Sequence, residues 1–443
     1  MKRPLSPPAV LVVGFAVLIV IGTVVLWLPV SSSSGDWTPP LTAAFTAASA
    51  VCVTGLVVVD TGTYWSPFGQ VVILALIQLG GLGFMTGSTL LLFLLVRHRS
   101  SLRDRILVQA STAAPNLGSI TAVLRRVAVF TVLAEGVGSM VLGAVFLARG
   151  EEPLRAMTWG VFHAVSAFNN AGFDLMGDYR SLTEYATDPV VLGIIAGLLI
   201  LGGLGFAIVG DIAGKRAWHR LALETKVVVL TSAGLLIGGG IVLGLAEWTN
   251  LGTLGALPPT DRVVNAFFMS ASARTAGFNS IATQHMLEAS LVVMIVLMFI
   301  GGASGSTAGG IKVNTFTLLL IAIVSSVRGL PSATAFGRRV PHLVVYRALA
   351  VALLAVAVAF VVTVGIEAWG EARLVDHAFE AVSALGTVGL TTAFTPALPD
   401  PARVLLMVAM FVGRLGPLTL VLALTARDRP VSHRVAIESM RIG

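Results

Sequence analysis

The sequence has little charge and almost no cysteine. Charged residues make up 12% of the 443 residues and hydrophobic residues 56%, whereas about 25% of the residues in a typical soluble domain are charged. A chain of this composition cannot cover a large folded domain with polar side chains, so it is predicted to be a polytopic membrane protein. The single cysteine, Cys52, excludes a disulfide within the chain.

Long apolar segments recur along the whole chain. About 20 apolar residues are needed to cross the hydrocarbon core of a bilayer. Eight segments approach or exceed this length, at residues 9–30, 67–96, 120–148, 190–209, 226–245, 287–327, 343–369 and 404–424. The sixth of them is interrupted by glycines. An even number of spans places both termini on the same side of the membrane.

The charged residues are divided unequally between the two sides of this topology. Twenty of the 29 basic residues and five of the 22 acids fall on the side of the termini, which the positive-inside rule makes cytoplasmic. The net charge of +7 is therefore attributed to topology and to contact with membrane lipid, not to nucleic acid. The opposite side carries sixteen acids. This acidic side either concentrates cations at the membrane surface or reflects ordinary topology, and the sequence leaves both interpretations open.

One pattern occurs four times: a phenylalanine, three residues, a small residue, five residues, a glycine, and then leucine or phenylalanine. The copies lie at residues 45–56, 162–173, 267–278 and 379–390, each between two long apolar segments. This predicts four repeats at residues 1–98, 119–216, 223–328 and 341–426, followed by a cytoplasmic tail at 427–443. A fourfold repeat of this kind indicates one chain wrapped around a single axis.

The segment before each repeated glycine is apolar but short. Residues 41–50 and 374–384 are examples, and neither is long enough to span a bilayer. Such segments are predicted to be re-entrant half-helices, because irregular backbone is tolerated at membrane depth only when it is buried in protein or lines a wet cavity. The expected fold is an all-α polytopic membrane protein, with eight transmembrane helices and four re-entrant half-helices around one pore.

A second motif recurs in the second long helix of each repeat. It contains the pairs Gly80-Gly81, Gly202-Gly203, Gly301-Gly302 and Gly413-Arg414. Small residues let helices approach closely inside a membrane, and this packing role is the expected one in repeats one and two.

The repeated loops read VCVTGL at 51–56, NNAGF at 169–173, ARTAGF at 273–278 and GTVGL at 386–390, and residues 301–312 read GGASGSTAGGIK. These loops resemble the four pore loops of the Trk/Ktr/HKT potassium transporters, and residues 301–312 resemble the mid-pore gating loop of that family. Five motifs in order along nearly the whole chain make the resemblance specific. The chain begins directly with the first helix of repeat one, which is similar to a Ktr-type subunit.

The resemblance implies uptake of potassium across the inner membrane of a bacterium. It also implies a homodimer with one pore in each protomer and a cytoplasmic ring of regulatory subunits that bind ATP or ADP. The sequence shows no nucleotide-binding domain, so any control by nucleotide is assigned to that partner. No cofactor other than the permeant ion is expected. Sodium dependence is known in Ktr systems, but no residue pattern tests it here.

The repeated glycines suit a potassium filter. Potassium must exchange its hydration shell for oxygens held by the protein, and rings of backbone carbonyls do this in potassium channels. Aiming successive carbonyls at one axis requires backbone conformations that glycine adopts without a Cβ clash. The predicted filter residues, which would hold K⁺ through their carbonyls, are Val53, Thr54, Gly55, Asn170, Ala171, Gly172, Thr275, Ala276, Gly277, Thr387, Val388 and Gly389. In the plant relatives a serine at the first glycine position accompanies sodium preference, so Gly55 favours potassium.

Arg274 lies within the third loop, where a cation would oppose cation binding. It is expected to point behind the filter and to pair with an acid, with Glu380 or Asp174 as candidates, because an unpaired buried charge is very costly.

The glycine-rich segment is a candidate gate. Each glycine disfavours a helix by about 1 kcal/mol relative to alanine, so five glycines within residues 301–310 predict an unwound loop. The spacing of Gly305, Gly310 and Lys312 does not match a phosphate-binding loop. The predicted gate residues are Gly301, Gly302, Ser304, Gly305, Ser306, Thr307, Gly309, Gly310, Lys312 and Arg414.

Arg414 replaces a glycine that the other three repeats keep. A positive charge there would form a barrier to cations, and in the resembling family the matching arginine narrows the pore together with the gating loop. The alternative is a packing salt bridge with Glu135. Lys312 is expected either to anchor the loop to an acid or to carbonyls, or to face the inner cavity.

The sequence fits two other functions less well. The potassium-translocating subunit of an ATP-driven pump shares the four-loop design, although such subunits are usually longer and have different loops. An intramembrane enzyme would need paired catalytic groups at membrane depth. The ionisable residues expected there, which are Glu135, Arg274, Lys312 and Arg414, make a poor catalytic set.

Overall fold

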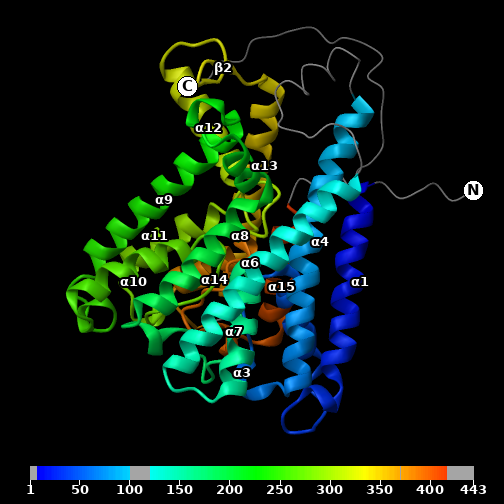
Figure 1. Cartoon of the computed structure of the whole chain (residues 1–443), viewed down its shortest axis with the longest axis vertical. Coiled ribbons are helices and arrows are strands. Elements are labelled where there is room, and N and C mark those ends of the chain that lie inside the picture. The colour runs from blue at the N-terminus through cyan, green and yellow to red at the C-terminus, as the bar shows by residue number, and fades with distance from the viewer. Residues whose placement is uncertain (1–6, 100–119, 370, 417–443) are drawn as a thin grey trace, which may run out of the picture.

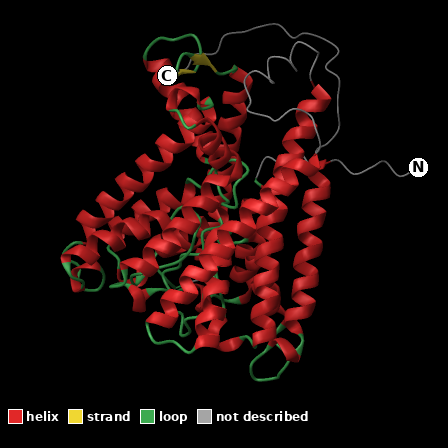
Figure 2. Ribbon diagram, in the orientation of Figure 1, coloured by secondary structure: helices red, strands yellow, loops and turns green. Residues whose placement is uncertain are grey.

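The computed structural model describes residues 7–99, 120–369 and 371–416, and it is almost entirely helical in this part of the chain (Figure 2). Within these residues, six helices are long and apolar enough to cross a membrane. They are α1 (Pro7–Trp27), α4 (Pro67–Arg99), α6 (Ile120–Ala148), α8 (Pro189–Lys215), α9 (Leu223–Glu247) and α13 (His342–Glu367). The prediction of an all-α polytopic fold is confirmed.

The two remaining predicted spans take other forms. The sixth is divided into α11 (Glu288–Phe299) and α12 (Val313–Val327), with an irregular loop at residues 300–312 between them. The eighth begins as α15 (Asp400–Leu415), and the predicted continuation to residue 424 lies outside the described residues. The predicted boundary between repeats one and two, at residues 98–119, lies largely outside the described residues. The predicted tail at 427–443 lies wholly outside them.

Four shorter helices precede the repeated glycines, as the sequence predicts. They are α2 (Pro40–Cys52), α7 (Pro153–Phe168), α10 (Pro259–Ser272) and α14 (Leu374–Gly386). Three of them begin with a proline, whose restricted φ suits the first turn of a helix. Each packs against the long helix that precedes it, and α2, α7 and α14 also pack against the one that follows.

The rest of the described chain consists of connections. α3 (Thr61–Tyr64) is a single turn, and β1 (Thr334–Ala335) pairs with β2 (Arg338–Arg339) as a small antiparallel hairpin. Short 3₁₀ turns lie at Pro29–Ser31, Thr183–Tyr185, Trp218–Arg220, Leu254–Ala256, Thr283–His285 and Thr395–Ala397.

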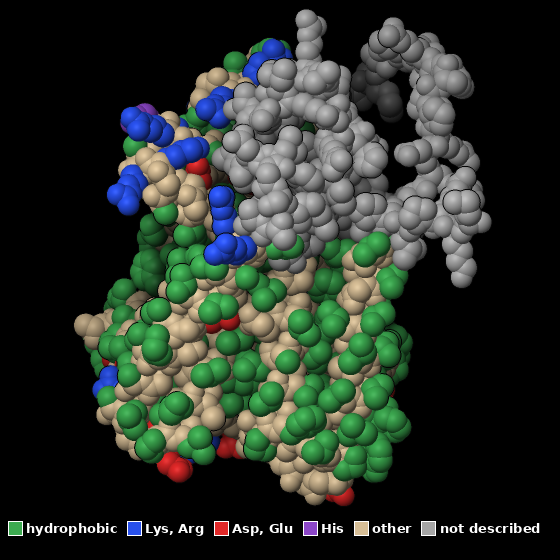
Figure 3. Space-filling view, turned by 45° about the vertical axis from the view of Figure 1, so that its right-hand side comes forward, with side chains coloured by type: hydrophobic (Ala, Val, Ile, Leu, Met, Phe, Trp, Pro, Cys, Tyr) green, Lys and Arg blue, Asp and Glu red, His purple; other side chains and the backbone are tan. Residues whose placement is uncertain are grey.

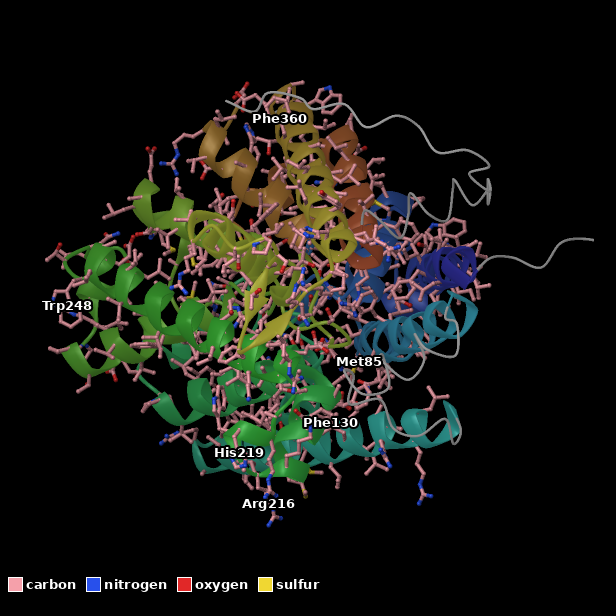
Figure 4. The ribbon with its side chains drawn as sticks, turned by 90° about the horizontal axis from the view of Figure 1, so that it is seen from above. Met85, Phe130, Arg216, His219, Trp248 and Phe360 are labelled. Carbon is pink, nitrogen blue, oxygen red and sulfur yellow. The ribbon has the colours of Figure 1, made fainter. Side chains whose placement is uncertain are left out.

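The repeats follow one another around a common centre. Seen from above, the chain passes from the blue helices of repeat one through cyan and green to the orange helices of repeat four (Figure 4). Met85 lies toward the middle of this view, whereas Trp248, His219 and Phe360 lie toward its edge. In the side view the half-helices α7, α10 and α14 lie among the longer helices (Figure 1). The loops that follow the half-helices therefore lie in the interior, where their residues are buried.

The described residues expose many apolar side chains. On the face shown in Figure 3, hydrophobic side chains form a broad band, with Lys and Arg gathered toward one end. Many large apolar side chains are exposed, including Met140 at 70% and Phe360 at 68%. A surface of this kind suits lipid, because soluble proteins rarely expose apolar patches of such extent.

Glycines allow the half-helices to contact the long helices through backbone. A Cβ at Gly80 would lie 2.0 Å from the carbonyl oxygen of Val51. A Cβ at Gly202 would lie 1.8 Å from Phe168 O, and one at Gly413 would lie 1.8 Å from Leu385 O. The packing role predicted for repeats one and two is confirmed, and Gly413 makes the same kind of contact in repeat four. In repeat three the neighbour is different, because a Cβ at Gly301 would lie 2.0 Å from Gly309 O, within the same glycine-rich segment.

This contact predicts a local sensitivity within α8. Gly202→Ala would place a methyl group against the Phe168 carbonyl, and we expect a loss of about 1–3 kcal/mol of stability from overpacking. The melting temperature of the detergent-solubilised protein should fall. Gly197→Ala in the same helix is the matched control, because no atom lies within 4 Å of its added Cβ. Equal melting temperatures for the two variants would contradict the packing role.

Candidate functional site

The four repeated loops share one unusual backbone conformation. Each repeated glycine has a positive φ, of 92° at Gly55, 69° at Gly172, 81° at Gly277 and 98° at Gly389. The residue two positions earlier is also left-handed in every repeat, although none is glycine: Val53, Asn170, Thr275 and Thr387 have φ of 56°, 58°, 73° and 50°. Valine and threonine are β-branched and rarely adopt this conformation, so the surrounding packing must impose it in three of the loops, whereas asparagine adopts it more readily.

The glycines pack against one another's loops in a closed cycle. A Cβ at Gly55 would lie 2.3 Å from Ala171 O, and one at Gly172 would lie 2.8 Å from Ala276 O. A Cβ at Gly277 would lie 2.4 Å from Val388 O, and one at Gly389 would lie 2.2 Å from Thr54 O. Each loop therefore contacts the next, and the fourth contacts the first. We call these four loops, at residues 53–55, 170–172, 275–277 and 387–389, the glycine ring.

Serine hydroxyls hold the ring from the preceding half-helices. The Oγ atoms of Ser49 and Ser383 accept hydrogen bonds from the amides of Gly55 and Gly389, both at 3.1 Å. The Ser166 hydroxyl donates to Phe173 O at 2.7 Å.

In repeat three the serine that performs this role is Ser272, which donates to Phe278 O. The repeated pattern in the sequence pointed to Ala271 instead. The displacement arises because Ala276 N bonds to Ser272 O, four residues back, whereas the matching amides in the other repeats bond five residues back, as Thr54 N does to Ser49 O.

The carbonyl groups of the ring are available for a cation. Within the described part of the chain, none of the twelve ring carbonyl oxygens accepts a hydrogen bond. Buried carbonyls are almost always paired in folded proteins, so a set of free ones in four equivalent loops is unusual. Such oxygens can replace the hydration shell of an alkali cation.

The surroundings of Arg274 differ from expectation. Its guanidinium donates to Ser232 O at 3.3 Å, Ser232 Oγ at 3.1 Å and Gly301 O at 3.3 Å. No ion pair involves it among the described residues, so the predicted pairing with Glu380 or Asp174 is wrong. Neutral oxygens from α9 and the glycine-rich segment take the place of the acid.

Glu380 has a different structural role. It lies on α14 and is fully buried, and its carboxylate accepts hydrogen bonds from Thr391 Oγ1, from Thr392 N at 3.2 Å and from Thr395 Oγ1 at 2.6 Å. These donors belong to the segment that follows Gly389. Glu380 therefore holds the chain just beyond the fourth loop of the ring.

The predicted unwound loop is present at residues 300–312, and its two ends are joined. Ile300 and Ile311 form a parallel bridge, Gly301 N bonds to Ile311 O at 2.8 Å, and Val313 N bonds to Gly302 O at 3.0 Å. Within this closed loop Ser306 Oγ donates to Ala303 O at 2.7 Å. Ser304 N donates to Asn314 Oδ1 of α12 at 3.1 Å, which ties the loop to the following helix. We call residues 300–312 the central loop.

A break in α8 receives the central loop. Gly205 has φ 75° and ψ 160° inside a continuous apolar helix, a conformation that only glycine adopts easily. Upstream of the break, Ala303 N bonds to Gly203 O at 2.9 Å and Thr307 N bonds to Gly202 O at 3.3 Å. The sequence indicated only close packing for this motif, because an isolated glycine in a helix gives no sign of a break.

The central loop also contacts the glycine ring directly. The Thr307 hydroxyl lies 3.1 Å from Phe168 O and 2.9 Å from Asn170 Oδ1. A Cβ at Gly309 would lie 1.8 Å from Thr387 Oγ1, and Gly310 has a left-handed φ of 62° beside Gly386. The central loop therefore rests against the second and fourth loops of the ring.

Two cations bind consecutive carbonyls of the central loop. Arg414, which is fully buried, donates to Thr307 O and to Gly80 O, the latter at 3.1 Å. Lys312 donates to Ala308 O, which agrees with the expectation that it anchors the loop to carbonyls.

The alternative prediction, a salt bridge between Arg414 and Glu135, is wrong. Glu135 instead accepts hydrogen bonds from Gln78 at 3.1 Å and from Asn169 at 2.9 Å, next to the second loop of the ring.

The closed cycle predicts that each ring glycine is irreplaceable. In Gly55→Ala the methyl group would meet Ala171 O at 2.3 Å, in addition to the strain of φ 92°. Gly35→Ala is the matched control, because Gly35 also has a positive φ, of 75°, but no neighbour within 4 Å. The conformational strain alone amounts to about 1–2 kcal/mol.

We expect Gly55→Ala to lower the melting temperature more than Gly35→Ala does, and to change the ratio of K⁺ to Na⁺ flux in proteoliposomes. Equal behaviour of the two variants would show that the cycle of contacts is unimportant.

The break in α8 predicts a second effect. Gly205→Ala would disfavour the observed backbone by about 1–3 kcal/mol and bring a Cβ to 3.1 Å from Gly305 O. The central loop should then bind α8 less firmly, and amide hydrogen exchange in residues 301–312 should accelerate. Gly210→Ala, in the same helix and without neighbours within 4 Å, should leave this exchange unchanged. Unaltered exchange in Gly205→Ala would contradict the docking role.

Comparisons with known proteins agree with this arrangement. The family model TrkH, described as a cation transport protein, matches residues 7–430. The chain is 38% identical to the Ktr system potassium uptake protein B of Bacillus subtilis, over 96% of this chain and 94% of that protein. It is 37% identical to the potassium/sodium uptake protein NtpJ of Enterococcus hirae, over 100% of this chain and 98% of that protein.

The fold also matches a solved structure. The crystal structure of the potassium transporter TrkH from Vibrio parahaemolyticus superposes with a TM-score of 0.72 at 19% identity, covering 96% of this chain and 86% of that one. The helical fold is thus shared at low sequence identity. Together with the full-length relatives, this shows that the chain belongs to the TrkH family of cation transport proteins, which are transporters and not enzymes.

Proposed function

We propose that this chain is the ion-translocating subunit of a bacterial potassium uptake system. The observation that carries the proposal is the glycine ring, with its four equivalent loops and twelve carbonyl oxygens that accept no hydrogen bond within the described residues. Relatives named for potassium uptake are similar over nearly their whole length, which supports the choice of ion.

The ring would select the ion. Its carbonyls would replace the hydration shell of K⁺, and the carboxyl ends of the four half-helices would add partial negative charge. Gly55 supports K⁺ as the preferred cation, because with it all four repeats have a glycine at this position. The name of the Enterococcus relative includes sodium as well as potassium, so sodium dependence belongs to the proposal.

The central loop and Arg414 would control passage. The loop rests against the ring through Thr307 and Gly309, and Arg414 places a buried positive charge on the same loop. A positive charge close to the permeation path raises the energy of a passing cation. Movement of the loop together with Arg414 would therefore open the path.

The assembly follows the resemblance to Ktr systems. We propose a homodimer with one pore in each protomer, both termini in the cytoplasm, and a cytoplasmic ring of nucleotide-binding subunits that moves the gate in response to ATP or ADP. The cluster of Lys and Arg at one end of the visible face supports this orientation (Figure 3).

The test of potassium uptake is rescue of a bacterium that lacks its own potassium uptake systems. We expect growth at low potassium when the chain is expressed with a cognate regulatory subunit, and impaired growth with Gly55→Ser. Failure of the wild-type pair, although the protein is present in the membrane, would refute potassium uptake. Normal growth and normal K⁺/Na⁺ discrimination with Gly55→Ser would refute the filter assignment.

The gate assignment predicts the effect of removing the buried cation. Arg414→Ala should increase K⁺ flux into proteoliposomes several-fold, because the barrier and the hydrogen bonds to Thr307 and Gly80 are lost together. Arg414→Lys, which keeps the charge but cannot reach two carbonyls in the same geometry, should give an intermediate flux. Flux equal to that of wild type in both variants would remove the barrier role.

A further inference from the structure

Phe84 lies beside Lys312 of the central loop and beside Arg414 of α15, the two cations that donate to carbonyls of the loop. Its ring centroid is 4.6 Å from Cζ of Arg414 and 4.7 Å from Nζ of Lys312. Phe84 is 7% exposed and belongs to α4, one turn after Gly80, whose carbonyl accepts from Arg414. α4 therefore offers Arg414 both a carbonyl and an aromatic ring.

Among the residues that the structure describes, the two cations have no acidic partner. Arg414 and Lys312 take part in no salt bridge within the described part of the chain. Each donates to a neutral carbonyl, Thr307 O or Ala308 O, and these carbonyls belong to consecutive residues. Two like charges beside one ring repel each other, and this repulsion would push them apart unless something attracts both.

An aromatic face supplies such an attraction without net charge. The negative face of a phenyl ring attracts Lys and Arg within about 6 Å, and more strongly when the pair is shielded from water. A carboxylate would attract them too, but it would also bind the permeating cation. A neutral ring attracts a permeating cation much less strongly than a carboxylate does, so it can stabilise gate cations with less competition.

We propose that Phe84 is a positioning residue of the gate, which holds Arg414 and Lys312 together on the Thr307–Ala308 carbonyls through cation–π interaction. The proposal rests on the gate function proposed above. It assigns to α4, a helix of repeat one, a part in holding the central loop of repeat three. The simpler alternative is that Phe84 only fills space, and the two explanations differ in what they predict for the electronics of the ring.

The test replaces Phe84 by 3,4,5-trifluorophenylalanine, which keeps the shape of the ring but weakens its negative face, and measures K⁺ flux into proteoliposomes. We expect a rise of about twofold to thirtyfold, the range that corresponds to the usual strength of a cation–π pair. Phe84→Leu should raise flux at least as much, and Phe84→Tyr should retain wild-type flux.

The same fluorinated residue at Phe130 is the matched control. Phe130 lies on α6 and packs edge-on against Phe168 with ring centroids 5.6 Å apart, and none of the cation–π pairs of the described residues includes it (Figure 4). Fluorination there should leave flux unchanged.

A second readout separates positioning from gating. A small amine-reactive acylating reagent should modify Lys312 faster when the ring at position 84 is fluorinated. Mass spectrometry measures the rate of this modification. Lys226, which lies 5.8 Å from the ring of Phe336, serves as an internal reference. Faster acylation with unchanged flux would support the positioning role of Phe84 but overturn the proposed gate. Unchanged acylation and flux, or an effect of Phe84→Leu alone, would show that Phe84 only fills space and overturn the proposal.

Discussion

The structure depends on backbone that packs directly against backbone at the centre of the molecule. In the glycine ring, each Cα faces a carbonyl of the next loop, so no side chain separates the four repeats there. Gly80, Gly202 and Gly413 extend the same principle outward, because they let the half-helices touch the long helices through carbonyl oxygens. The apolar exterior then only needs to suit lipid, while register and spacing are determined inside.

Polar contacts connect this centre to the central loop. Thr307 alone joins α8, the end of α7 and Arg414 through its amide, hydroxyl and carbonyl groups. Hydrogen bonds in a low-dielectric interior are strong and leave costly unpaired groups when they break. Displacement of the central loop would therefore break several contacts at once, which favours two discrete arrangements over a continuous slide.

The sequence predicted the features that repeat, which are the four half-helices and the four glycines with positive φ. It also predicted the unwound central loop of repeat three, because five glycines in ten residues disfavour a helix. It failed where one repeat departs from the common spacing or where a partner is distant in sequence. Ser272 lies one residue away from the serine position of the other repeats, and the break at Gly205 lies where the distant central loop bonds to α8. The partners of Arg274 are neutral oxygens, which no charge pattern can indicate.

The cyclic contact between loops is formed by a single chain, and this has a consequence for how charge can be placed. In an assembly of four identical subunits, one arginine in the sequence becomes four around the axis, and their mutual repulsion would be difficult to bury. Here the four quarters share a backbone plan but have separate sequences. One quarter can carry Arg414, another the central loop and a third Phe84. A nearly fourfold backbone can therefore hold a set of side chains that has no fourfold symmetry.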